Sequence, residues 1–356
     1  MSQKIQNVKK IWRETFSDSP EWIDMYFSRV YTDDDAFLLE SDGQPVSSLI
    51  LSQYSMLLHG REIPVSYMSG ASTRRNARGN GNMSRLLAIA LRQARHRGDW
   101  LVTLIPASRR LYGYYAQRGF STVFYIEEQR YTSLHSFPFS GTYVEVTDLS
   151  SDAVYDLFHR LESSRDGTIL HSRRDFDTIL LDNALDGGDA VAIADAATGD
   201  IAAIAFAVSE GSRESDRLVI RRLLAVNPDA EQAILHTLRQ RHPSSPFTVI
   251  APVTPHSFPI ESRGMARIVN VEEILRVYAE AAPHVSMYIR VSDPIIEENN
   301  RTFFIHEASL STVDASPRLD LDVSVDVLAS ILFSTPRIGD VFNLPTLRPH
   351  ISLMLE

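Results

Sequence analysis

The sequence predicts an α+β protein with more than one domain. Strand patterns dominate residues 36–73, and the helix that follows returns the chain to another strand, which is an α+β order. A strand–turn–helix–strand order occurs around residues 65–105 and again around 217–253, and the tail after residue 287 is rich in strands. A chain of 356 residues with 44% apolar residues is long enough for two or three domains with ordinary cores.

Composition narrows the possible partners and location. The net charge of −10, without a long basic run, argues against nucleic acid binding. The absence of cysteine excludes disulfides, thiolate nucleophiles and Cys-ligated metals. Without an apolar run of about 18 residues or an apolar signal core in MSQKIQNVKK, we expect no membrane span and a cytoplasmic location. We also expect no metal, because the candidate histidines lack ligand-like spacing such as H-x-x-x-H; these are His171, His236, His242, His256 and His284.

Two short helices are predicted at the N-terminus. Within residues 1–16, apolar side chains recur at helical spacing. Ser19 is a favourable N-cap and Pro20 a favourable first residue for a second helix, which carries an aromatic stripe including Trp22 and Tyr26. Such a stripe usually belongs to the core, the interpretation we favour, although Trp22 and Tyr26 could instead line a substrate pocket.

Residues 36–68 predict two β-hairpins. Their turns fall at Asp42-Gly43 and at His59-Gly60. Four antiparallel strands are therefore expected before the chain reaches its most distinctive stretch.

That stretch is residues 65–87, in which a strand passes through a glycine- and arginine-rich turn into a helix. The first N–H groups of a helix lack intrahelical partners and, with the helix dipole, favour phosphate. Gly79 and Gly81 allow close backbone approach, and Arg74, Arg75 and Arg78 supply guanidinium groups. We interpret this turn as a pyrophosphate cradle; the alternative is an ordinary connection with solvated arginines.

The sequence after this turn makes the motif more specific. A P-loop would need Lys and then Ser or Thr after Gly81, and a dinucleotide fingerprint would need a third glycine. Instead, a buried strand at 100–105 is followed by LYGYYAQRGF at 111–120, and this order resembles the GNAT N-acetyltransferase superfamily. The resemblance is carried by Arg78, Gly79, Asn80, Gly81, Asn82 and Met83, and by Tyr115, Gly119 and Phe120. Met83 departs from the usual Gly or Ala.

The resemblance implies acetyl-CoA as co-substrate, held by the cradle at 78–83. Backbone groups of Ala71, Ser72 and Thr73 match the strand end that pairs with the pantetheine arm and polarises the thioester carbonyl. Tyr115 matches the tyrosine that acts as general acid toward the CoA thiolate. In this superfamily the loop between the first two helices borders the acceptor pocket, which is why Trp22 and Tyr26 remain candidates.

The second strand–turn–helix–strand unit differs at the equivalent turn. Its sequence, AVNPDAEQA, has no glycine and places Asp229 and Glu231 at the helix start. Carboxylates there would occupy and neutralise the donors that a phosphate needs. We therefore expect a GNAT-like repeat without a cofactor site.

The three-part order resembles the enhanced-intracellular-survival (Eis) type of acetyltransferase. The resemblance implies a GNAT domain at 1–133, a degenerate GNAT-like domain at 134–283 and a sterol-carrier-protein-like α+β domain at 284–356. It also implies a homo-oligomer, a trimer or hexamer, and a C-terminal carboxylate that acts as base, here that of Glu356. The alternative for Glu356 is a solvated carboxylate on a packed tail, and this tail is shorter than in the best-known members. The stretches that carry the resemblance are TRRNARGNGNMSRLL, LYGYYAQRGF, RGMARIVNV at 263–271 and LRVYAEAAPHVSMYIRVSDPIIEENN at 275–300.

Two functions of different classes follow. One is an enzyme that moves an acetyl group from acetyl-CoA to a primary amine, a small molecule or a peptide lysine, by direct attack on the thioester. The other is a non-catalytic protein that binds acyl-CoA or an apolar ligand. The presence of Arg78, Gly79, Gly81 and Tyr115 favours the enzyme. The identity of the amine cannot be read from the sequence, because a net charge does not define a pocket.

Overall fold

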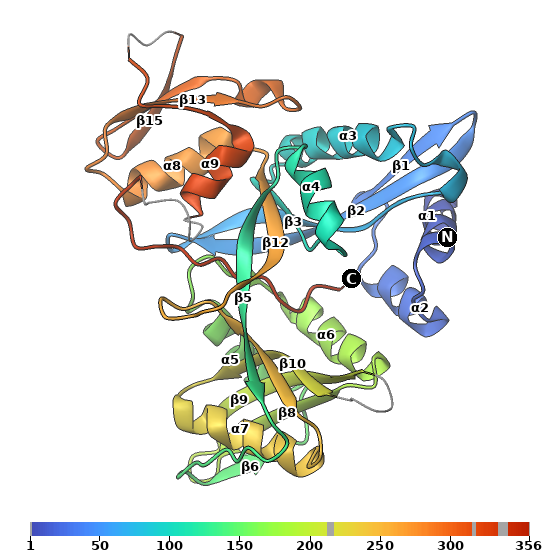
Figure 1. Ribbon diagram of the computed structural model, residues 1–356, viewed down its shortest axis with the longest axis vertical. Helices are drawn as coiled ribbons and strands as arrows, with labels where there is room; N and C mark the ends of the chain where they lie inside the picture. Colours follow the sequence, from blue (N-terminus) through green and yellow to red (C-terminus); the bar gives the residue numbers. More distant parts are fainter. Residues whose placement is uncertain (1, 212–216, 315–317, 334–340, 356) are drawn as a thin grey trace. The chain divides into compact units, whose positions relative to one another are not determined.

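The computed structural model describes residues 2–211, 217–314, 318–333 and 341–355 (Figure 1). The chain forms two compact units. Unit 1 contains Met1–Phe124 and Ser262–Pro349, and unit 2 contains Tyr125–Glu261 and His350–Leu355. Among the helices in the described ranges, none is long and apolar enough to cross a membrane.

Unit 1 begins with the two predicted helices, α1 (Gln3–Thr15) and α2 (Pro20–Arg29). The Oγ of Ser19 accepts a hydrogen bond of 3.1 Å from the N–H of Trp22, which confirms the predicted N-cap. The apolar faces of both helices meet in an aromatic cluster in which Trp12 contacts Trp22, Tyr26 and Phe27.

Three antiparallel strands follow, and the prediction of four is wrong. They are β1 (Ala36–Ser41), β2 (Gln44–Leu58) and β3 (Arg61–Thr73). The polar stretch Ser52–Ser55 suggested a break between two hairpins. Instead it pairs residue by residue with β3, from Ser52 opposite Tyr67 to Ser55 opposite Pro64. The pairing partner therefore keeps β2 continuous where its own pattern is interrupted.

A parallel crossover forms the centre of unit 1. β3 is connected by α3 (Asn82–His96) to β4 (Leu101–Leu104), which pairs parallel with β3. α4 (Arg109–Ala116) and β5 (Ser121–Tyr131) follow, and β5 begins in unit 1 and ends in unit 2. Much later in the sequence, β12 (Glu261–Ile268) pairs antiparallel with β4 and lies between β4 and β5 in the strand order.

The core of unit 1 positions the start of α3. Five residues at helical spacing are buried against the strands: Leu86, Leu87, Ala90, Leu91 and Ala94. Figure 1 shows α3 lying along the sheet of β1, β2 and β3, and all three strands contact it. The helix axis is thereby fixed relative to the end of β3.

The C-terminal part of unit 1 contains a second, four-stranded sheet with strand order β15-β14-β13-β16. α8 packs against β14 and β15, and α9 packs against β13 and β16. Residues 302–313 form a hairpin that turns at Glu307-Ala308, where both residues have positive φ. The elements are α8 (Val271–Ala281), β13 (Met287–Ser292), β14 (Thr302–His306), β15 (Ser309–Val313), β16 (Leu321–Ser324) and α9 (Val325–Leu332).

A buried ion pair connects β12 to the segment after β13. Nη2 of Arg267 lies 2.6 Å from Oδ1 of Asp293, and both side chains are fully buried. Nε of Arg267 also donates to the carbonyl of Arg118, at 2.9 Å. Burial would raise the pKa of Asp293, but Arg267 and hydrogen bonds to the carboxylate outweigh burial and lower it.

Unit 2 contains the second crossover, β10–α7–β11, in which β10 and β11 pair parallel. Its strands follow the order β5-β11-β10-β9-β8-β6. One core cluster joins α7 to one face of the strands, and another joins α5 and α6 to the opposite face. The elements are β6 (Tyr143–Glu145), α5 (Asp152–Glu162), β7 (Ile169–Leu170), α6 (Arg173–Leu185), β8 (Asp189–Asp195), β9 (Ile201–Glu210), β10 (Arg217–Ala225), α7 (Pro228–Arg241) and β11 (Phe247–Pro252).

Candidate active site

The turn between β3 and α3 adopts the backbone conformation that its glycines allow. A 3-10 turn over Arg75–Ala77 is followed by Gly79 with φ of +84° and Gly81 with φ of +73°. A Cβ added at either glycine would meet no atom within 4 Å, so both positions are open. Glycine is therefore favoured at both positions by the left-handed backbone and not by a lack of space for a side chain.

The start of α3 offers free backbone donors. Gly81 is the N-cap residue and provides no side-chain hydrogen bond to the helix, and the first turn contains no acidic residue. The first N–H groups of α3 therefore have neither a capping acceptor nor a neutralising charge beside them. This arrangement suits an external anion.

Two predicted cradle residues use their side chains to hold the turn. Asn82 is buried, and its Nδ2 donates to the carbonyl of Ala77 at 3.0 Å. Met83 is partly buried against the core cluster beneath α3. Both residues are left with their backbone N–H groups for a ligand.

The three predicted arginines differ in their surroundings. Arg74 forms an ion pair of 3.1 Å with Glu14 of α1. Nε of Arg78 donates to the carbonyl of Thr73 at 2.9 Å, which ties the turn to the end of β3. Arg75 and Arg78 are exposed, so these two are better placed than Arg74 to meet a ligand in solution.

The end of β3 contains a β-bulge that the sequence did not predict. Ile50 of β2 pairs with Ser69 and Ser48 pairs with Ser72, so Gly70 and Ala71 together oppose Leu49. Gly70 has φ of +59°, and a bulge of this kind leaves backbone groups unpaired. Of the three residues predicted to pair with the pantetheine arm, Ala71 lies in the bulge, whereas Ser72 and Thr73 lie opposite Ser48 and Ser47 of β2.

Tyr115 lies on α4 with its ring in the core cluster of unit 1 and only 8% of its surface exposed. Its hydroxyl forms no hydrogen bond within the described part of the chain. Burial raises the pKa of Tyr115 to about 12; Tyr114 adds to this effect and Arg118 opposes it. The phenol is therefore protonated at neutral pH and its proton is available to a partner.

Arg118 is a further candidate for the site, which the sequence motif did not single out. Its Nη2 and Nε donate to the Oγ of Ser84 at 2.6 and 3.2 Å, and its guanidinium lies 3.6 Å from the ring centroid of Tyr114. Ser84 is in the first turn of α3, so Arg118 places a positive charge beside the same helix start. Its position inside LYGYYAQRGF was the available signal, but this contact requires α4 to pack against α3.

Trp22 and Tyr26 are both buried, with exposed fractions of 6% and 1%. Their rings stack at 5.1 Å, and the hydroxyl of Tyr26 is 2.6 Å from the Oγ of Ser69 on β3. These contacts favour the core interpretation over a wall of the substrate pocket.

The C-terminal tail is described up to Leu355, so Glu356 lies outside the described residues. Ile351, Met354 and Leu355 are buried, so the apolar segment that precedes Glu356 packs into the protein at these three positions.

At the equivalent turn of unit 2, the side chain of Asn227 caps α7, and the side chain of Asp229 binds a different segment from the one predicted. Oδ1 of Asn227 accepts from the N–H of Ala230 at 2.8 Å and caps α7. The carboxylate of Asp229 accepts from the N–H groups of Ser140 and Gly141, at 2.8 and 2.9 Å, rather than from α7. The expectation that Asp229 occupies the helix's own donors is therefore wrong in detail, although α7 does begin with an acidic first turn and a capping side chain.

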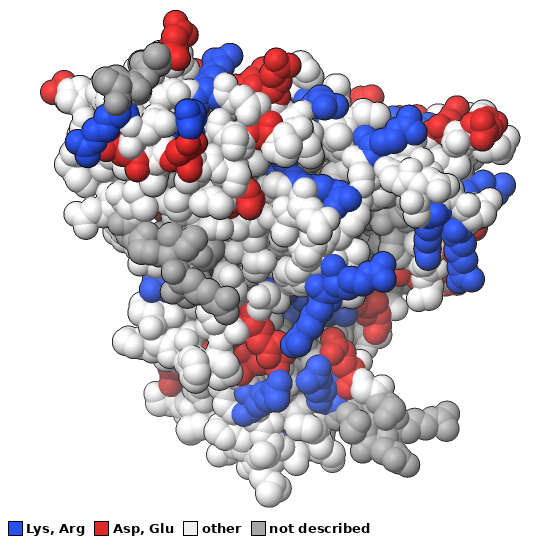
Figure 2. Space-filling view, turned by 45° about the horizontal axis from the view of Figure 1, so that its top comes forward, with Lys and Arg blue, Asp and Glu red and all other residues white. Residues whose placement is uncertain are grey.

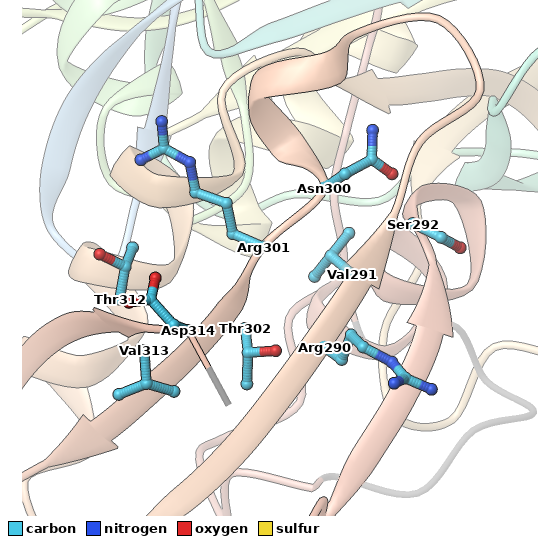
Figure 3. A pocket seen from close by; sticks show the side chains of 9 residues that line it. All are labelled: Arg290, Val291, Ser292, Asn300, Arg301, Thr302, Thr312, Val313 and Asp314. Carbon is cyan, nitrogen blue, oxygen red and sulfur yellow. The ribbon is translucent and has the colours of Figure 1, made fainter. Parts of the chain in front are cut away.

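A groove of about 530 Å³ lies over the C-terminal sheet of unit 1 (Figure 3). Arg290 and Arg301 point away from one another in Figure 3, and Arg290 is paired with Asp322. The lining is mostly polar, which does not suit an apolar ligand. The residues are Arg290, Val291, Ser292, Asn300, Arg301, Thr302, Thr312, Val313 and Asp314.

Charged side chains are mixed over the face shown in Figure 2, where basic residues alternate with acidic ones. This mixture agrees with the net charge of −10 and gives no sign of a basic binding stripe on that face.

Comparison with known proteins identifies the first part of the chain. Residues 2–123 match the family model described as an acetyltransferase (GNAT) domain. No curated protein matches the sequence.

Among solved structures, a GCN5-related N-acetyltransferase from Anabaena variabilis shows a TM-score of 0.75 at 16% identity, over 93% of this chain and 88% of that chain. A probable N-acyltransferase from Enterococcus faecalis shows a TM-score of 0.75 at 15% identity, with coverage of 93% and 88%. Eis1 from Mycobacterium abscessus shows a TM-score of 0.70 at 13% identity, again with coverage of 93% and 88%. At these identities the likeness concerns the fold. Residues 2–123 thus match a GNAT acetyltransferase domain in sequence, and the chain as a whole shares the fold of GNAT-related proteins.

Proposed function

We propose that the protein is an acetyl-CoA-dependent N-acetyltransferase that acts on a primary amine. The observation that carries this proposal is the uncapped, acid-free start of α3, which lies in one unit with the phenol of Tyr115, a hydroxyl with no hydrogen-bond partner among the described residues. Both features belong to the segment that matches the GNAT domain, residues 2–123.

In this proposal the pyrophosphate of CoA binds at the turn before α3. Backbone N–H groups from Gly79 to Met83 supply donors, including those of Asn80, Gly81 and Asn82. Arg78 and Arg118 add positive charge at the same place, supported by the exposure of Arg78 and by the contact of Arg118 with Ser84. Backbone groups of Ala71, Ser72 and Thr73 pair with the pantetheine arm and polarise the thioester carbonyl.

The reaction forms a bond between the amine nitrogen and the carbonyl carbon and breaks the bond from that carbon to sulfur. Nitrogen loses a proton and sulfur gains one. Tyr115 has a pKa of about 12, whereas a thiol has one of about 8.5, so complete transfer from the phenol alone is uphill by about 5 kcal/mol. We therefore propose that the hydroxyl of Tyr115 donates a hydrogen bond to the departing sulfur. As the hydroxyl gives its proton to sulfur, it receives a proton from the more acidic nitrogen of the intermediate.

The α-carboxylate of Glu356 is the proposed base. It would take the proton that the ammonium form of the acceptor loses before attack, whereas the proton that nitrogen loses in the intermediate goes to sulfur through Tyr115. Its ordinary pKa of about 3.3–3.7 means that this step needs desolvation or a bridging water, and the carboxylate can also orient an ammonium group. Burial of the tail up to Leu355 supports a terminus held in place rather than a frayed one.

The acceptor class we propose is a primary amine, either a small molecule or a peptide lysine. Net negative charge favours the approach of a cation such as a polycationic amine. Because Trp22 and Tyr26 are buried, we assign the acceptor contact to other residues.

We further propose the three-domain organisation of 1–133, 134–283 and a sterol-carrier-protein-like module at 284–356, and a homotrimer or homohexamer. Sedimentation equilibrium of the full chain tests the oligomer: a mass of three or six chains is expected, and a monomer or dimer contradicts it.

The competing function is a non-catalytic protein that binds acyl-CoA or an apolar ligand. A protonated phenol without a hydrogen-bond partner in the described ranges favours catalysis, and the polar groove over the C-terminal sheet does not favour an apolar ligand. The deciding experiment incubates the full chain with acetyl-CoA and a panel of primary amines and measures acetylated amine by mass spectrometry. Acetylated product is expected; CoA binding without product from any amine would overturn the proposal in favour of the binding protein.

A further inference from the structure

The C-terminal tail, residues 350–355, is held within unit 2 without being part of a helix or strand of its own. The N–H of His350 donates to the carbonyl of Gly167 at 2.9 Å, and the N–H of Ile169 donates to the carbonyl of His350 at 3.1 Å. Leu353 packs against the core cluster shared by α5 and α6. The position of the tail therefore depends on what holds the segment 167–171.

That segment is anchored at its other end by Glu162, the last residue of α5. The carboxylate of Glu162 lies 3.0 and 3.2 Å from Nδ1 of His171 and accepts from its backbone N–H at 3.3 Å. Both side chains are fully buried. Burial opposes the charged form of His171, but the Glu162 carboxylate outweighs burial and raises the pKa of His171.

Arg222 of β10 brings a second cation to the same carboxylate. The pairing of β10 with β9 shifts register between Ile220 and Arg222, so the regular alternation of side chains is broken there. Ile220 and Leu223 consequently face the α7 core, and Leu224 faces the α5–α6 core. Arg222 precedes Leu223 in the strand, so its side chain lies on the opposite face, the face that α5 and Glu162 cover. The negative charge of Glu162 favours the charged form of Arg222 there.

Glu162 is the main compensation for the charge of Arg222. Arg222 is 2% exposed, and its Nε and Nη1 have no acceptor among the residues with described positions. Burial lowers the pKa of Arg222 to about 10; the Glu162 carboxylate opposes this fall and Arg165 adds to it. Loss of the Glu162 charge would leave a buried guanidinium without a counter-ion.

We propose that Glu162 is a positioning residue for the C-terminal tail. Its carboxylate joins the end of α5 to the segment 167–171 through His171, with the buried Arg222 of β10 on the same side of the sheet, and residues 350–355 dock on this platform. Through the tail, this cluster sets the position of Leu355, the last residue with a described position. The effect on catalysis rests on the proposed function, whereas the docking of the tail does not.

The test compares Glu162→Gln with Asp189→Asn by hydrogen–deuterium exchange of the full chain. Gln keeps the size of Glu162 and removes its charge. Asp189 is a matched control because its carboxylate also contacts an arginine and a histidine, Arg241 and His242, but at a partly exposed site. We expect exchange in residues 350–355 to increase at least tenfold in E162Q and to stay unchanged in D189N. Unchanged exchange in E162Q would overturn the proposal.

A double variant keeps the test decisive if E162Q folds poorly. In Glu162→Gln/Arg222→Gln the uncompensated charge is removed, so the fold is expected to be retained. Because the platform loses the contact between Glu162 and His171, residues 350–355 are still expected to exchange faster than in the wild type. Wild-type protection of the tail in this double variant would show that the cluster does not position it.

Turnover separates this inference from the proposed function. If Glu356 acts as base, E162Q should lower kcat for acetyl transfer at least tenfold and leave the KM for acetyl-CoA within twofold. Faster exchange of the tail together with an unchanged kcat would support the docking platform and contradict the role of Glu356.

Discussion

At the scale of single residues, Gly81 decides whether the start of α3 is open to an anion. It adopts φ of +73° with no atom within 4 Å of an added Cβ, so a side chain there meets little steric resistance. Aspartate tolerates this conformation better than most residues, and it is also a good helix N-cap. Its carboxylate would then occupy the donors that we assign to CoA.

We therefore predict that Gly81→Asp weakens CoA binding at least about tenfold, equivalent to about 1.4 kcal/mol, in addition to the stability that its left-handed backbone costs any side chain. Titration calorimetry with CoA measures this effect. Gly43→Asp is the control, because Gly43 has a similar φ of +70° and open surroundings but lies in the β1–β2 turn. Equal CoA affinity in G81D and G43D would contradict the cradle.

The raised pKa of Tyr115 leads to a prediction on pH dependence. A phenol with a pKa of about 12 stays protonated, and able to donate, throughout the range in which an amine loses its proton. The rate should therefore rise with pH as the amine deprotonates and show no fall caused by Tyr115 below about pH 11. A profile of kcat from pH 6 to 10.5 checks this; a descending limb near pH 10 that is absent from Tyr115→Phe would contradict it.

At the scale of elements, α1 packs tightly on β3 where the ring of Trp12 contacts Gly70. A Cβ on Gly70 would lie 2.2 Å from the ring of Trp12, and Gly70 has φ of +59°. We predict that Gly70→Ala destabilises the protein by about 2–5 kcal/mol, from overpacking and left-handed strain together. Urea unfolding measures this, with Gly43→Ala as a control for strain alone; a loss in G70A no larger than in G43A would show that the contact with Trp12 is not tight.

Helices were easier to predict from this sequence than strands. Ser19-Pro20 and Asn227-Pro228 are local signals, and both helices begin where those residues stand. The continuity of β2 through Ser52–Ser55 and the bulge at Gly70 and Ala71 depend on the partner strand, which a local pattern does not contain.

At the scale of the whole molecule, the buried pair of Arg267 and Asp293 joins residues 263–271 to residues 275–300. In the sequence these two stretches carried a family resemblance but gave no sign that they contact one another. Removing one partner leaves the other charge buried and unpaired. We predict that Arg267→Met destabilises unit 1 by about 3–5 kcal/mol. Arg290→Met, which breaks an exposed pair with Asp322, should cost far less stability, because solvent screens that pair.

Chemical denaturation of both variants measures the difference, and equal losses would contradict the structural role of the buried pair. The pair also has a pH signature. Because the pKa of Asp293 is lowered in the folded protein, its contribution to stability is present above about pH 4 and is lost as the pH falls further.

The candidate site residues could be named from the sequence, whereas the packing of the elements around them could not. Gly79, Gly81 and Tyr115 stand in local motifs, so their chemistry could be interpreted before any fold was known. The position of β12 between β4 and β5, and the contact of Arg118 with Ser84, arise from long-range packing that no spacing in the sequence encodes. The base proposed at Glu356 stays a prediction.

The central claim is that the phenol of Tyr115 serves acyl transfer from CoA bound at the start of α3. The most direct test measures kcat and CoA affinity together for Tyr115→Phe, with Tyr112→Phe as the control on the same helix, since the hydroxyl of Tyr112 donates to the carbonyl of Arg263 at 3.0 Å. We predict a fall in kcat of about 10²–10⁴-fold in Y115F with CoA affinity unchanged, and a near-wild-type kcat in Y112F. An unchanged kcat in Y115F would contradict the claim.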